Sequence, residues 1–531
     1  MRMRFRMRMK RYFPVILLIA AAVITITGYG VLKQGMFIDE IYSFGLSNSY
    51  YTPFVRDIHS TDETVIRLTQ KEMFDYLTVN DEDDFAYASV YHNQAEDVHP
   101  PLYYMLMHTV SSVFRNTYSK WPGLILNSSL YLGTLALAAV LAHKLFGDKY
   151  AVFVTVALYA FSHGGLSTGL MIRMYMLLTL LTVTLAYFVK LCLEKVTVRR
   201  LSGVFLSIAL GMLTQYYFVM YAFFVCCAAV LYMLLGKRYR DMFAFSAAAL
   251  LGIAVFVAVF PHVFSHMSAN KLVSGSSAAE NLLNIKGYIR RILTFVMYMP
   301  KEMPTALIAG VLSFAACIVF FRRAWASVCK SGAQTGHMLI IVIPAFAALI
   351  AIAVISPAFS SRYIYNLFPI FALAAAWALK TALDSVKVHS KGIKSALCIA
   401  LCVLSVVFLI RHQPDYIYPE HNERLDMLEE YADSPCIYFS EKYSPPVTQD
   451  ILYLINFRDV CIVQEPSSEG LREYLDGFEP AQPAIVFVDV NENWSSGYNA
   501  EEKLNGLLEN TQYTEWEKLY SFGLSETYVV R

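Results

Sequence analysis

Two adjacent carboxylates, Asp39 and Glu40 in the string FIDEIY, stand shortly after an apolar run that ends near Leu32. An unpaired charge at the edge of the hydrocarbon layer is costly, so acids in this place need a reason. Asp39 could act as a general base or hold an acceptor, because a dry surrounding raises the pKa of a carboxyl group towards the range useful for proton transfer. The pair could equally mark the point where a helix enters water, and the residues alone leave both interpretations open.

The string HPPLYY places His99 before two prolines and Tyr103 and Tyr104 after them. Prolines fix the backbone at the start of a helix, and tyrosines suit the membrane interface because they combine an apolar ring with a polar tip. A rigid helix start with an aromatic anchor explains these residues but not the histidine. His99 therefore indicates a hydrogen-bonding role towards a loop or a phosphate group.

Two isolated arginines stand at the ends of apolar runs, each close to a tyrosine: Arg173 with Tyr175, and Arg362 with Tyr363. The planar guanidinium group binds phosphate oxygens through two parallel hydrogen bonds, so these arginines are candidates for a phosphate or diphosphate clamp. The alternative is that both reach up to the lipid headgroups, as arginines near helix ends commonly do.

Tyr216 lies in a short turn between two apolar runs, and Lys271 lies in the Gly- and Ser-containing first part of the segment 263–304. The second part of that segment has the pattern of an amphipathic helix on the membrane surface. Such a segment could be a mobile lid that becomes ordered on substrate, or a plain connector.

Residues of metal-binding type occur in the first loop without a metal-binding spacing. His59, His92, Asp97 and His99 are joined by no regular pattern, and no CxxC or HExxH string appears. We therefore predict no metal site and leave open whether a divalent cation acts as a cofactor. The chain has no basic stripe either, so nucleic acid is not an expected partner.

The elements that must position these residues are membrane helices. Of the 531 residues 56% are hydrophobic and only 16% are charged, and long apolar runs recur through most of the chain. Each run approaches the roughly 20 residues that cross a bilayer. About eleven transmembrane helices are predicted, at 12–32, 123–143, 150–170, 174–193, 201–216, 217–235, 242–262, 305–321, 338–356, 363–379 and 395–411.

Loop charges assign the sides of the membrane. The first residues carry many cations, and with 99–114 lying on the surface every Lys- and Arg-rich loop falls on the same side as the N-terminus. This predicts a multi-pass protein of the plasma membrane, of bacterial type, with a cytoplasmic N-terminus. The loops 33–122 and 263–304 and the tail 412–531 are then extracytoplasmic, and the bilayer is a partner.

The tail 412–531 forms a domain of its own in this scheme, beside a transmembrane domain of residues 1–411. Its short apolar runs, such as PCIYFS, DVCIVQ and PAIVFVDV, alternate with helical segments and are followed by two further strands near the end. This order predicts a small extracytoplasmic α/β layer domain. It carries no Gly-rich phosphate fingerprint, so we predict no nucleotide site there.

The strings FIDEIY, HPPLYY, RMY, TQYYF and SRYIYNLFPIFAL occur in this order, and together they resemble the membrane-embedded glycosyltransferases of the GT-C fold. The resemblance is to the branch of the protein O-mannosyltransferases, which includes the aminoarabinose transferases. It covers about residues 10–380 in architecture, and the long acidic first loop and the α/β tail depart from it.

The resemblance implies a glycosyltransferase that takes a sugar from a polyprenyl-phosphate carrier and passes it, with inversion, to an extracytoplasmic acceptor. Asp39 would activate the acceptor hydroxyl, with Glu40 as its partner. The remaining implied residues line the cavity or bind the donor phosphate: His99, Tyr103, Tyr104, Arg173, Tyr175, Tyr216, Lys271, Arg362 and Tyr363.

Two other functions stay open at this point. A transporter or a flippase for lipid-linked glycans would require charged residues inside the spans and an internal repeat, neither of which stands out. A non-catalytic assembly protein of the cell surface would use the tail as its binding module.

Overall fold

The structure, a computed structural model, describes residues 2–55, 65–267, 280–440, 445–480, 482–491 and 498–531. The chain divides into two compact units. The helical unit consists of Met1–Val31, Asp97–Tyr103 and Gly123–Asp415, and the sheet unit consists of Leu32–Glu96, Tyr104–Pro122 and Tyr416–Arg531.

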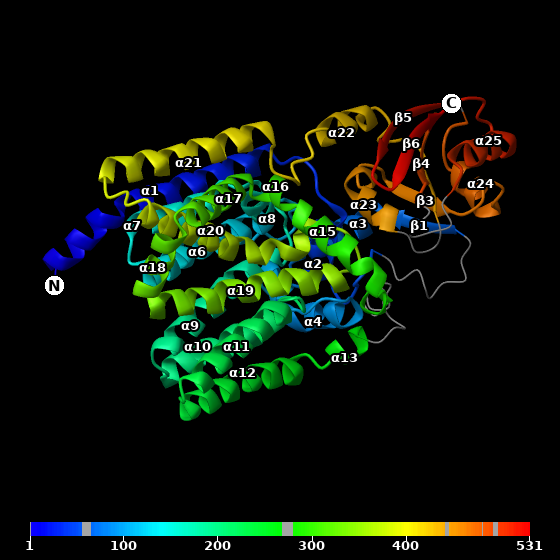
Figure 1. The fold of residues 1–531 in the computed structure, drawn as a ribbon. Helices are drawn as coiled ribbons and strands as arrows, with labels where there is room; N and C mark the ends of the chain where they lie inside the picture. Colours follow the sequence, from blue (N-terminus) through cyan, green and yellow to red (C-terminus); the bar gives the residue numbers. More distant parts are fainter. Residues whose placement is uncertain (1, 56–64, 268–279, 441–444, 481, 492–497) are drawn as a thin grey trace. The chain divides into compact units, whose positions relative to one another are not determined.

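The helical unit is built from long helices and shorter connecting ones (Figure 1). The long helices are α1 (Arg2–Leu32), α6 (Trp121–Phe146), α9 (Tyr175–Glu194), α10 (Val198–Met212), α11 (Phe218–Leu235), α12 (Tyr239–Val259), α17 (Pro304–Val319), α19 (Gly332–Ile355), α20 (Phe368–Ser385) and α21 (Lys391–Arg411). The shorter ones are α7 (Lys149–Ala160), α8 (His163–Leu170), α13 (Val263–His266), η2 (Ile285–Gly287), α15 (Tyr288–Met297), α16 (Met299–Glu302), α18 (Phe321–Lys330) and η3 (Ser361–Leu367).

Among the described residues, 8 helices are long and apolar enough to cross a membrane. The number rises to 10 if each of two bent pairs, α7 with α8 and the helices from Ile285 to Val319, counts as one span. The predicted count of eleven is not confirmed. The expected span 201–216 corresponds to α10, which has only 15 residues, and at 1.5 Å per residue such a helix is roughly 22 Å long, short of the roughly 30 Å hydrocarbon layer.

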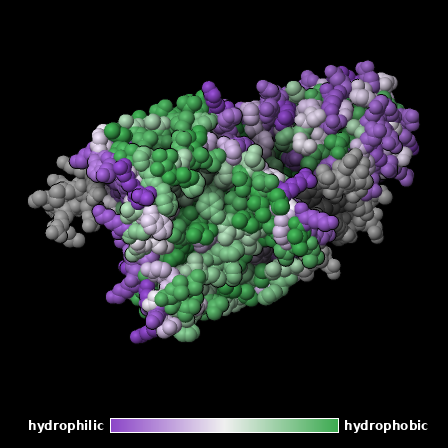
Figure 2. All heavy atoms as spheres, viewed as in Figure 1, coloured by the Kyte–Doolittle hydropathy of each residue, from purple (hydrophilic) through white to green (hydrophobic). Residues whose placement is uncertain are grey.

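The outside of the helical unit is largely apolar, as expected for a surface in contact with lipid. Figure 2 shows hydrophobic side chains covering the visible face of the long helices, with hydrophilic side chains gathered at the helix ends. Phe314 on α17 and Phe346 on α19 are more than half exposed. In water such a surface would be unstable, whereas lipid tails solvate it at little cost.

The sheet unit contains a six-stranded sheet in the order β1-β3-β2-β4-β6-β5. Its strands are β1 (Val65–Thr69), β2 (Cys436–Phe439), β3 (Asp459–Val463), β4 (Ala484–Asp489), β5 (Trp516–Phe522) and β6 (Ser525–Val530). Its helices are α2 (Ile38–Asn48), α3 (Gln70–Leu77), α4 (Tyr87–Glu96), α22 (His421–Glu429), α23 (Pro445–Leu454), α24 (Glu469–Leu475) and α25 (Ala500–Asn510), and α5 (Leu102–Ser111) begins in the helical unit.

The strands and helices expected in the tail are all present. The central strands β2, β3 and β4 pair in parallel, and β6 and β5 continue the sheet in antiparallel fashion. Every residue of β2 and of β4 is buried. Strands buried on both faces are read as continuous apolar runs, which is why these strands were recognisable in the sequence.

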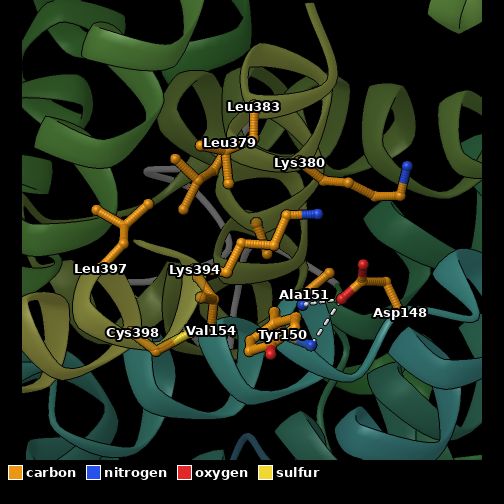
Figure 3. Close-up of a pocket in the computed structure, with 11 residues that line it drawn as sticks. Asp148, Tyr150, Ala151, Val154, Leu379, Lys380, Leu383, Lys394, Leu397 and Cys398 are labelled. Carbon is orange, nitrogen blue, oxygen red and sulfur yellow. Dashed lines mark hydrogen bonds between the residues drawn. The ribbon is translucent and has the colours of Figure 1, made fainter. Parts of the chain in front are cut away.

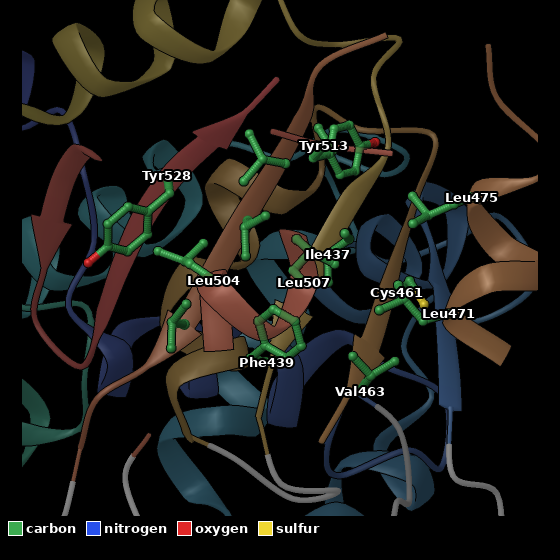
Figure 4. Close-up of a cluster of buried hydrophobic side chains, with 14 of the residues drawn as sticks. Ile437, Phe439, Cys461, Val463, Leu471, Leu475, Leu504, Leu507, Tyr513 and Tyr528 are labelled. Carbon is green, nitrogen blue, oxygen red and sulfur yellow. The ribbon is translucent and has the colours of Figure 1, made fainter. Parts of the chain in front are cut away.

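One edge strand of the sheet comes from the first loop, and the sequence did not indicate this. Strand β1 pairs antiparallel with β3, with Val65 opposite Val463 and Thr69 opposite Asp459. The buried core on one face of the sheet lies between strand residues such as Phe439 and helix residues such as Leu504 and Leu507 (Figure 4). The first loop and the tail therefore fold together.

Candidate functional site

Asp39 lies in the first turn of α2 in the sheet unit, where its side chain is half-buried. Its backbone carbonyl accepts a hydrogen bond from the hydroxyl of Ser43 at 2.9 Å. The partial positive charge at the start of a helix favours a carboxylate at this position.

Glu40 has a different environment from its neighbour. Its Oε2 accepts hydrogen bonds from Nζ of Lys33 at 2.9 Å and from the backbone N–H of Phe37 at 2.8 Å. Both side chains of the Lys33–Glu40 pair have zero exposure. Glu40 thus closes the N-terminus of α2 and neutralises a buried cation, so its geometry is that of a residue that holds α2 in position.

Lys33 was not singled out in the sequence, although it is a cation directly after the first apolar run. Its Nζ also donates to the carbonyl of Tyr416 at 2.6 Å and lies 5.6 Å from the ring centre of Tyr418. Burial lowers the pKa of Lys33, while the charge of Glu40 acts in the opposite direction. The pair therefore joins the start of α2 to the first residues of the tail within the sheet unit.

In the helical unit, Asp97, His99 and Arg173 form a charged cluster. Nδ1 of His99 lies 2.8 Å from Oδ2 of Asp97, and NH2 of Arg173 lies 3.5 Å from the same ring nitrogen. Arg173 is 4% exposed and sits in the tight turn between α8 and α9. An ionised carboxylate only accepts, so the tautomer that suits the 2.8 Å contact carries its hydrogen on Nδ1 and leaves Nε2 of His99 for another partner.

The cluster lowers the pKa of the Asp97 carboxyl group. Burial raises the pKa of this carboxyl group, but the charge and hydrogen bond of His99 and the charge of Arg173 outweigh burial, so the pKa lies below its ordinary value. Asp97 was recognised in the sequence only as a residue of metal-binding type. Its signal is its place two residues before His99, in the string DVHPP.

Tyr103 and the amide of Asn127 hold the turn before Arg173 in place. The hydroxyl of Tyr103 donates to Oδ1 of Asn127 at 3.1 Å, and Nδ2 of Asn127 donates to the carbonyl of Met171 at 2.6 Å. These bonds connect the start of α5 and α6 to the turn before Arg173. Tyr103 is fully buried, and Tyr104, which belongs to the sheet unit, is fully buried as well.

Tyr216 lies between α10 and α11, and its hydroxyl is 2.8 Å from Nδ1 of His266. Burial raises the pKa of the Tyr216 hydroxyl, and the charge of Asp97 adds to this effect. Tyr216 therefore lies within electrostatic reach of the cluster, and His266 is a further polar residue that the sequence did not indicate.

Arg362 and Tyr363 lie on η3, which packs against α9. The rings of Tyr363 and Tyr217 are 5.3 Å apart, and the ring of Tyr175, at the start of α9, is 6.1 Å from that of Tyr365. The segments that carry Arg173 and Arg362 are therefore neighbours. Lys271, the remaining predicted phosphate ligand, lies outside the described residues.

Two features lie apart from these residues. Figure 3 shows a pocket between α7, α20 and α21, into which Lys394 points, and none of the predicted site residues lines it. Within the described part of the chain, one group of side chains has the geometry to hold a metal ion, namely His163, Glu302 and Asp415. The metal-capable residues of the first loop form no such group in that part of the chain.

Comparisons with known proteins place this geometry in a fold class. Residues 98–264 match the family described as dolichyl-phosphate-mannose-protein mannosyltransferase. The whole chain is similar to two crystal structures of ArnT from Cupriavidus metallidurans, one bound to undecaprenyl phosphate and one in the apo state. In both cases 97% of each chain is covered at 12% identity, with TM-scores of 0.51 and 0.53. A comparison with curated proteins found no match.

The chain has the GT-C fold. The expected class, a polytopic helical membrane protein with a sheet-containing C-terminal region, is confirmed, and the chain is a multi-pass membrane protein. The matched family segment includes His99, Arg173 and Tyr216, whereas Asp39 precedes it.

Proposed function

We propose that this protein is a membrane glycosyltransferase that moves a sugar from a polyprenyl-phosphate carrier to an acceptor outside the cytoplasm. The observation that carries the proposal is the cluster of Asp97, His99 and Arg173 in a GT-C fold, of which His99 and Arg173 lie within the matched family segment and Asp97 directly precedes it. A buried arginine beside a carboxylate-bound histidine offers two donors for a phosphate group.

In the proposed reaction the acceptor hydroxyl gives its proton to Asp39 while its oxygen attacks the anomeric carbon of the sugar. The bond from that carbon to the phosphate oxygen breaks, and the phosphate leaves with the electron pair. Attack from the face opposite the leaving group inverts the configuration of the anomeric carbon. The products are the glycosylated acceptor, protonated Asp39 and the free polyprenyl phosphate.

Arg173 is the proposed partner of the leaving phosphate. Its charge stabilises the negative charge that develops on the phosphate as the glycosidic bond breaks. His99 donates from Nε2 when its ring is protonated, and Asp97 holds the ring through Nδ1. Arg362 and Lys271 remain further candidates for the same phosphate, and Tyr175, Tyr216 and Tyr363 for the walls of the donor site.

Glu40 has a positioning role in this proposal. Because its carboxylate is occupied by Lys33 and by the backbone N–H of Phe37, it keeps α2 and therefore Asp39 in a defined orientation.

The side of the membrane, the acceptor and the nature of the sugar belong to the proposal as well. We propose an extracytoplasmic acceptor because the loop charges favour a cytoplasmic N-terminus.

The test uses the purified full-length protein and two variants. Asp39→Asn preserves size and should bind undecaprenyl phosphate, measured by native mass spectrometry, like the wild type, yet transfer no sugar from an undecaprenyl-phosphate-sugar donor in membranes. Arg173→Ala should weaken binding of the same lipid by about tenfold or more, because a charge-assisted contact contributes about 1.5–3 kcal/mol.

Leu312→Ala, on the lipid-exposed face of α17, is the matched control and should leave both measurements unchanged. Transfer at the wild-type rate by Asp39→Asn would remove Asp39 as the base. Equal lipid binding by Arg173→Ala and the control would remove Arg173 as the phosphate ligand.

A further inference from the structure

Three side chains of metal-binding type meet inside the helical unit, although they are far apart in the sequence. His163 begins α8, Glu302 ends α16, and Asp415 follows α21. One ligand atom from each lies within 4.8 Å of the other two. The imidazole stands between the carboxylates: Nδ1 lies 3.1 Å from Oε2 of Glu302, and Nε2 lies 3.6 Å from Oδ1 of Asp415.

Hydrogen bonding accounts for only part of this arrangement. The 3.1 Å contact is a hydrogen bond, but 3.6 Å is too long for one. Glu302 is 1% exposed, and its second oxygen, Oε1, accepts no hydrogen bond from any residue that the structure describes. Buried carboxylate oxygens are normally satisfied, so Oε1 indicates a partner beyond these protein groups.

The charges lead to the same conclusion. Nζ of Lys301 lies 2.9 and 3.0 Å from the two oxygens of Asp415 and neutralises that carboxylate. With a neutral imidazole, Glu302 keeps one negative charge in a buried place. A proton on His163 would balance the charge. It would not give Oε1 of Glu302 a hydrogen-bond donor, and it would not explain why Nε2 and Oδ1 of Asp415 are 3.6 Å apart.

We propose that His163, Glu302 and Asp415 bind one zinc ion. One imidazole and two carboxylates are ligands that Zn²⁺ accepts, and the fourth position of a tetrahedral site is open to water. With bonds of roughly 2.0–2.2 Å, two ligands of such an ion lie roughly 3.3–3.6 Å apart. The separation of Nε2 and Oδ1 agrees with this value, and the carboxylate of Glu302, whose ligand atom lies within 4.8 Å of the other two, would move closer to complete the site.

The surroundings are suited to the ion. A cavity of about 120 Å³, lined in part by His163, Lys301 and His412, adjoins one of the three ligands and has room for a water molecule. Gly164 leaves space that the ring of Phe368 and Oε2 of Glu302 share, since a Cβ at this residue would lie 2.3 Å from the ring and 2.9 Å from Oε2. Each carboxylate oxygen of Asp415 has two lone pairs, so Oδ1 can accept a hydrogen bond from Lys301 and bind the ion at the same time.

The proposed ion has a structural effect that is separate from sugar transfer. It would tie the segment after α21 to α8 and α16, where the backbone N–H of Asp415 already donates to the hydroxyl of Ser167 at 3.0 Å. We therefore expect bound zinc to raise the thermal stability of the protein, because a ligand that binds only the folded state stabilises it.

The experiment measures zinc in the full-length protein, purified in detergent, stripped with EDTA and then dialysed against ZnCl₂. Inductively coupled plasma mass spectrometry should find one zinc ion per wild-type chain. Added zinc should also raise the unfolding temperature of the stripped wild-type protein. Glu302→Gln and Asp415→Asn should bind zinc at least about tenfold more weakly, in line with the loss of a ligand or of its support.

Two controls make the result specific. His389→Ala removes an exposed histidine just before the N-terminus of α21, at the opposite end of this helix from Asp415. This variant should leave zinc binding unchanged. Lys301→Gln should retain zinc, because the ion replaces the positive charge that is lost. Wild-type protein that binds no stoichiometric zinc, or that binds it no better than Glu302→Gln, would overturn the proposal in favour of a protonated His163 in an ionic network.

Discussion

The ion pair of Lys33 and Glu40 allows a quantitative prediction. The Nζ and Oε2 atoms are 2.9 Å apart and both side chains are fully buried. Glu40→Gln keeps an oxygen that can accept the hydrogen bond from the backbone N–H of Phe37 but removes the charge that balances Lys33. We expect the variant to fold less stably, because it leaves an uncompensated cation in a dry place.

The size of the loss has an upper limit. Breaking a buried ion pair typically costs about 3–5 kcal/mol. Lys33 can avoid a larger penalty by releasing its proton, and from an ordinary lysine pKa of about 10.4 this costs about 4.6 kcal/mol at pH 7, at about 1.36 kcal/mol per unit. We therefore expect Glu40→Gln to lower the free energy of unfolding by about 3–4.5 kcal/mol at pH 7.

The pH dependence tests the cause. In the variant, the folded state binds fewer protons at Lys33 than the unfolded state, so its stability rises with pH, by at most about 1.4 kcal/mol per unit. The deficit against wild type should shrink between pH 7 and pH 9 in urea unfolding. The double variant Lys33→Met/Glu40→Gln should recover most of the loss, because no charge is then left buried.

An exposed pair serves as the matched control. Glu517→Gln breaks the contact to Arg531, in which both side chains are about half exposed or more, and should cost less than about 1 kcal/mol at either pH. A deficit of Glu40→Gln that is equally small, or that does not change with pH, would refute the buried ion pair and with it the positioning role of Glu40.

Two further predictions concern the Asp97 cluster and the packing of α2. Because its pKa is lowered in the folded protein, Asp97 contributes stability that is present above its unfolded pKa of about 3.9 and is lost as the pH falls through the lower folded value. Asp97→Asn should lower the unfolding temperature at pH 7, for a loss of about 1.5–3 kcal/mol, and this difference should begin to shrink below about pH 4 and vanish only below the lowered folded pKa; a constant difference would contradict the charge effect. A Cβ at Gly45 would lie 1.9 Å from a tyrosine ring, whereas one at Gly28 meets nothing within 4 Å. Gly45→Ala should therefore destabilise the protein by about 1–3 kcal/mol, while Gly28→Ala, a matched change in a helix, should be neutral or stabilising, and equal unfolding temperatures would contradict this reasoning.

The sequence was informative where the structure depends on local properties. Helices that cross a bilayer need long apolar runs, and most of the runs recognised here became the 8 to 10 candidate spans. The exception, α10, shows that apolar composition does not determine where a helix ends. Thr197 caps its start, and the chain turns at Leu213, before the length of a span is reached.

The candidate site could be foreseen as a list of residues but not as an arrangement. Asp39, His99 and Arg173 were recognisable because charged or titratable groups are rare beside membrane helices. Their partners were not, since Asp97 and Lys33 look like ordinary loop charges until their neighbours are known. Glu40 changed most: the sequence paired it with Asp39, whereas the structure pairs it with Lys33.

By itself, then, the sequence determined most of the membrane helices and the strands of the tail, because period, length and composition are properties of short stretches, and it supplied the site residues as a hypothesis. Only the tertiary structure decided which distant stretches meet. Strand β1, from the first loop, joins β3 in the tail, Arg173 reaches His99, and His163, Glu302 and Asp415 converge. Such contacts depend on how helices and strands pack against one another, which no local pattern in the sequence records.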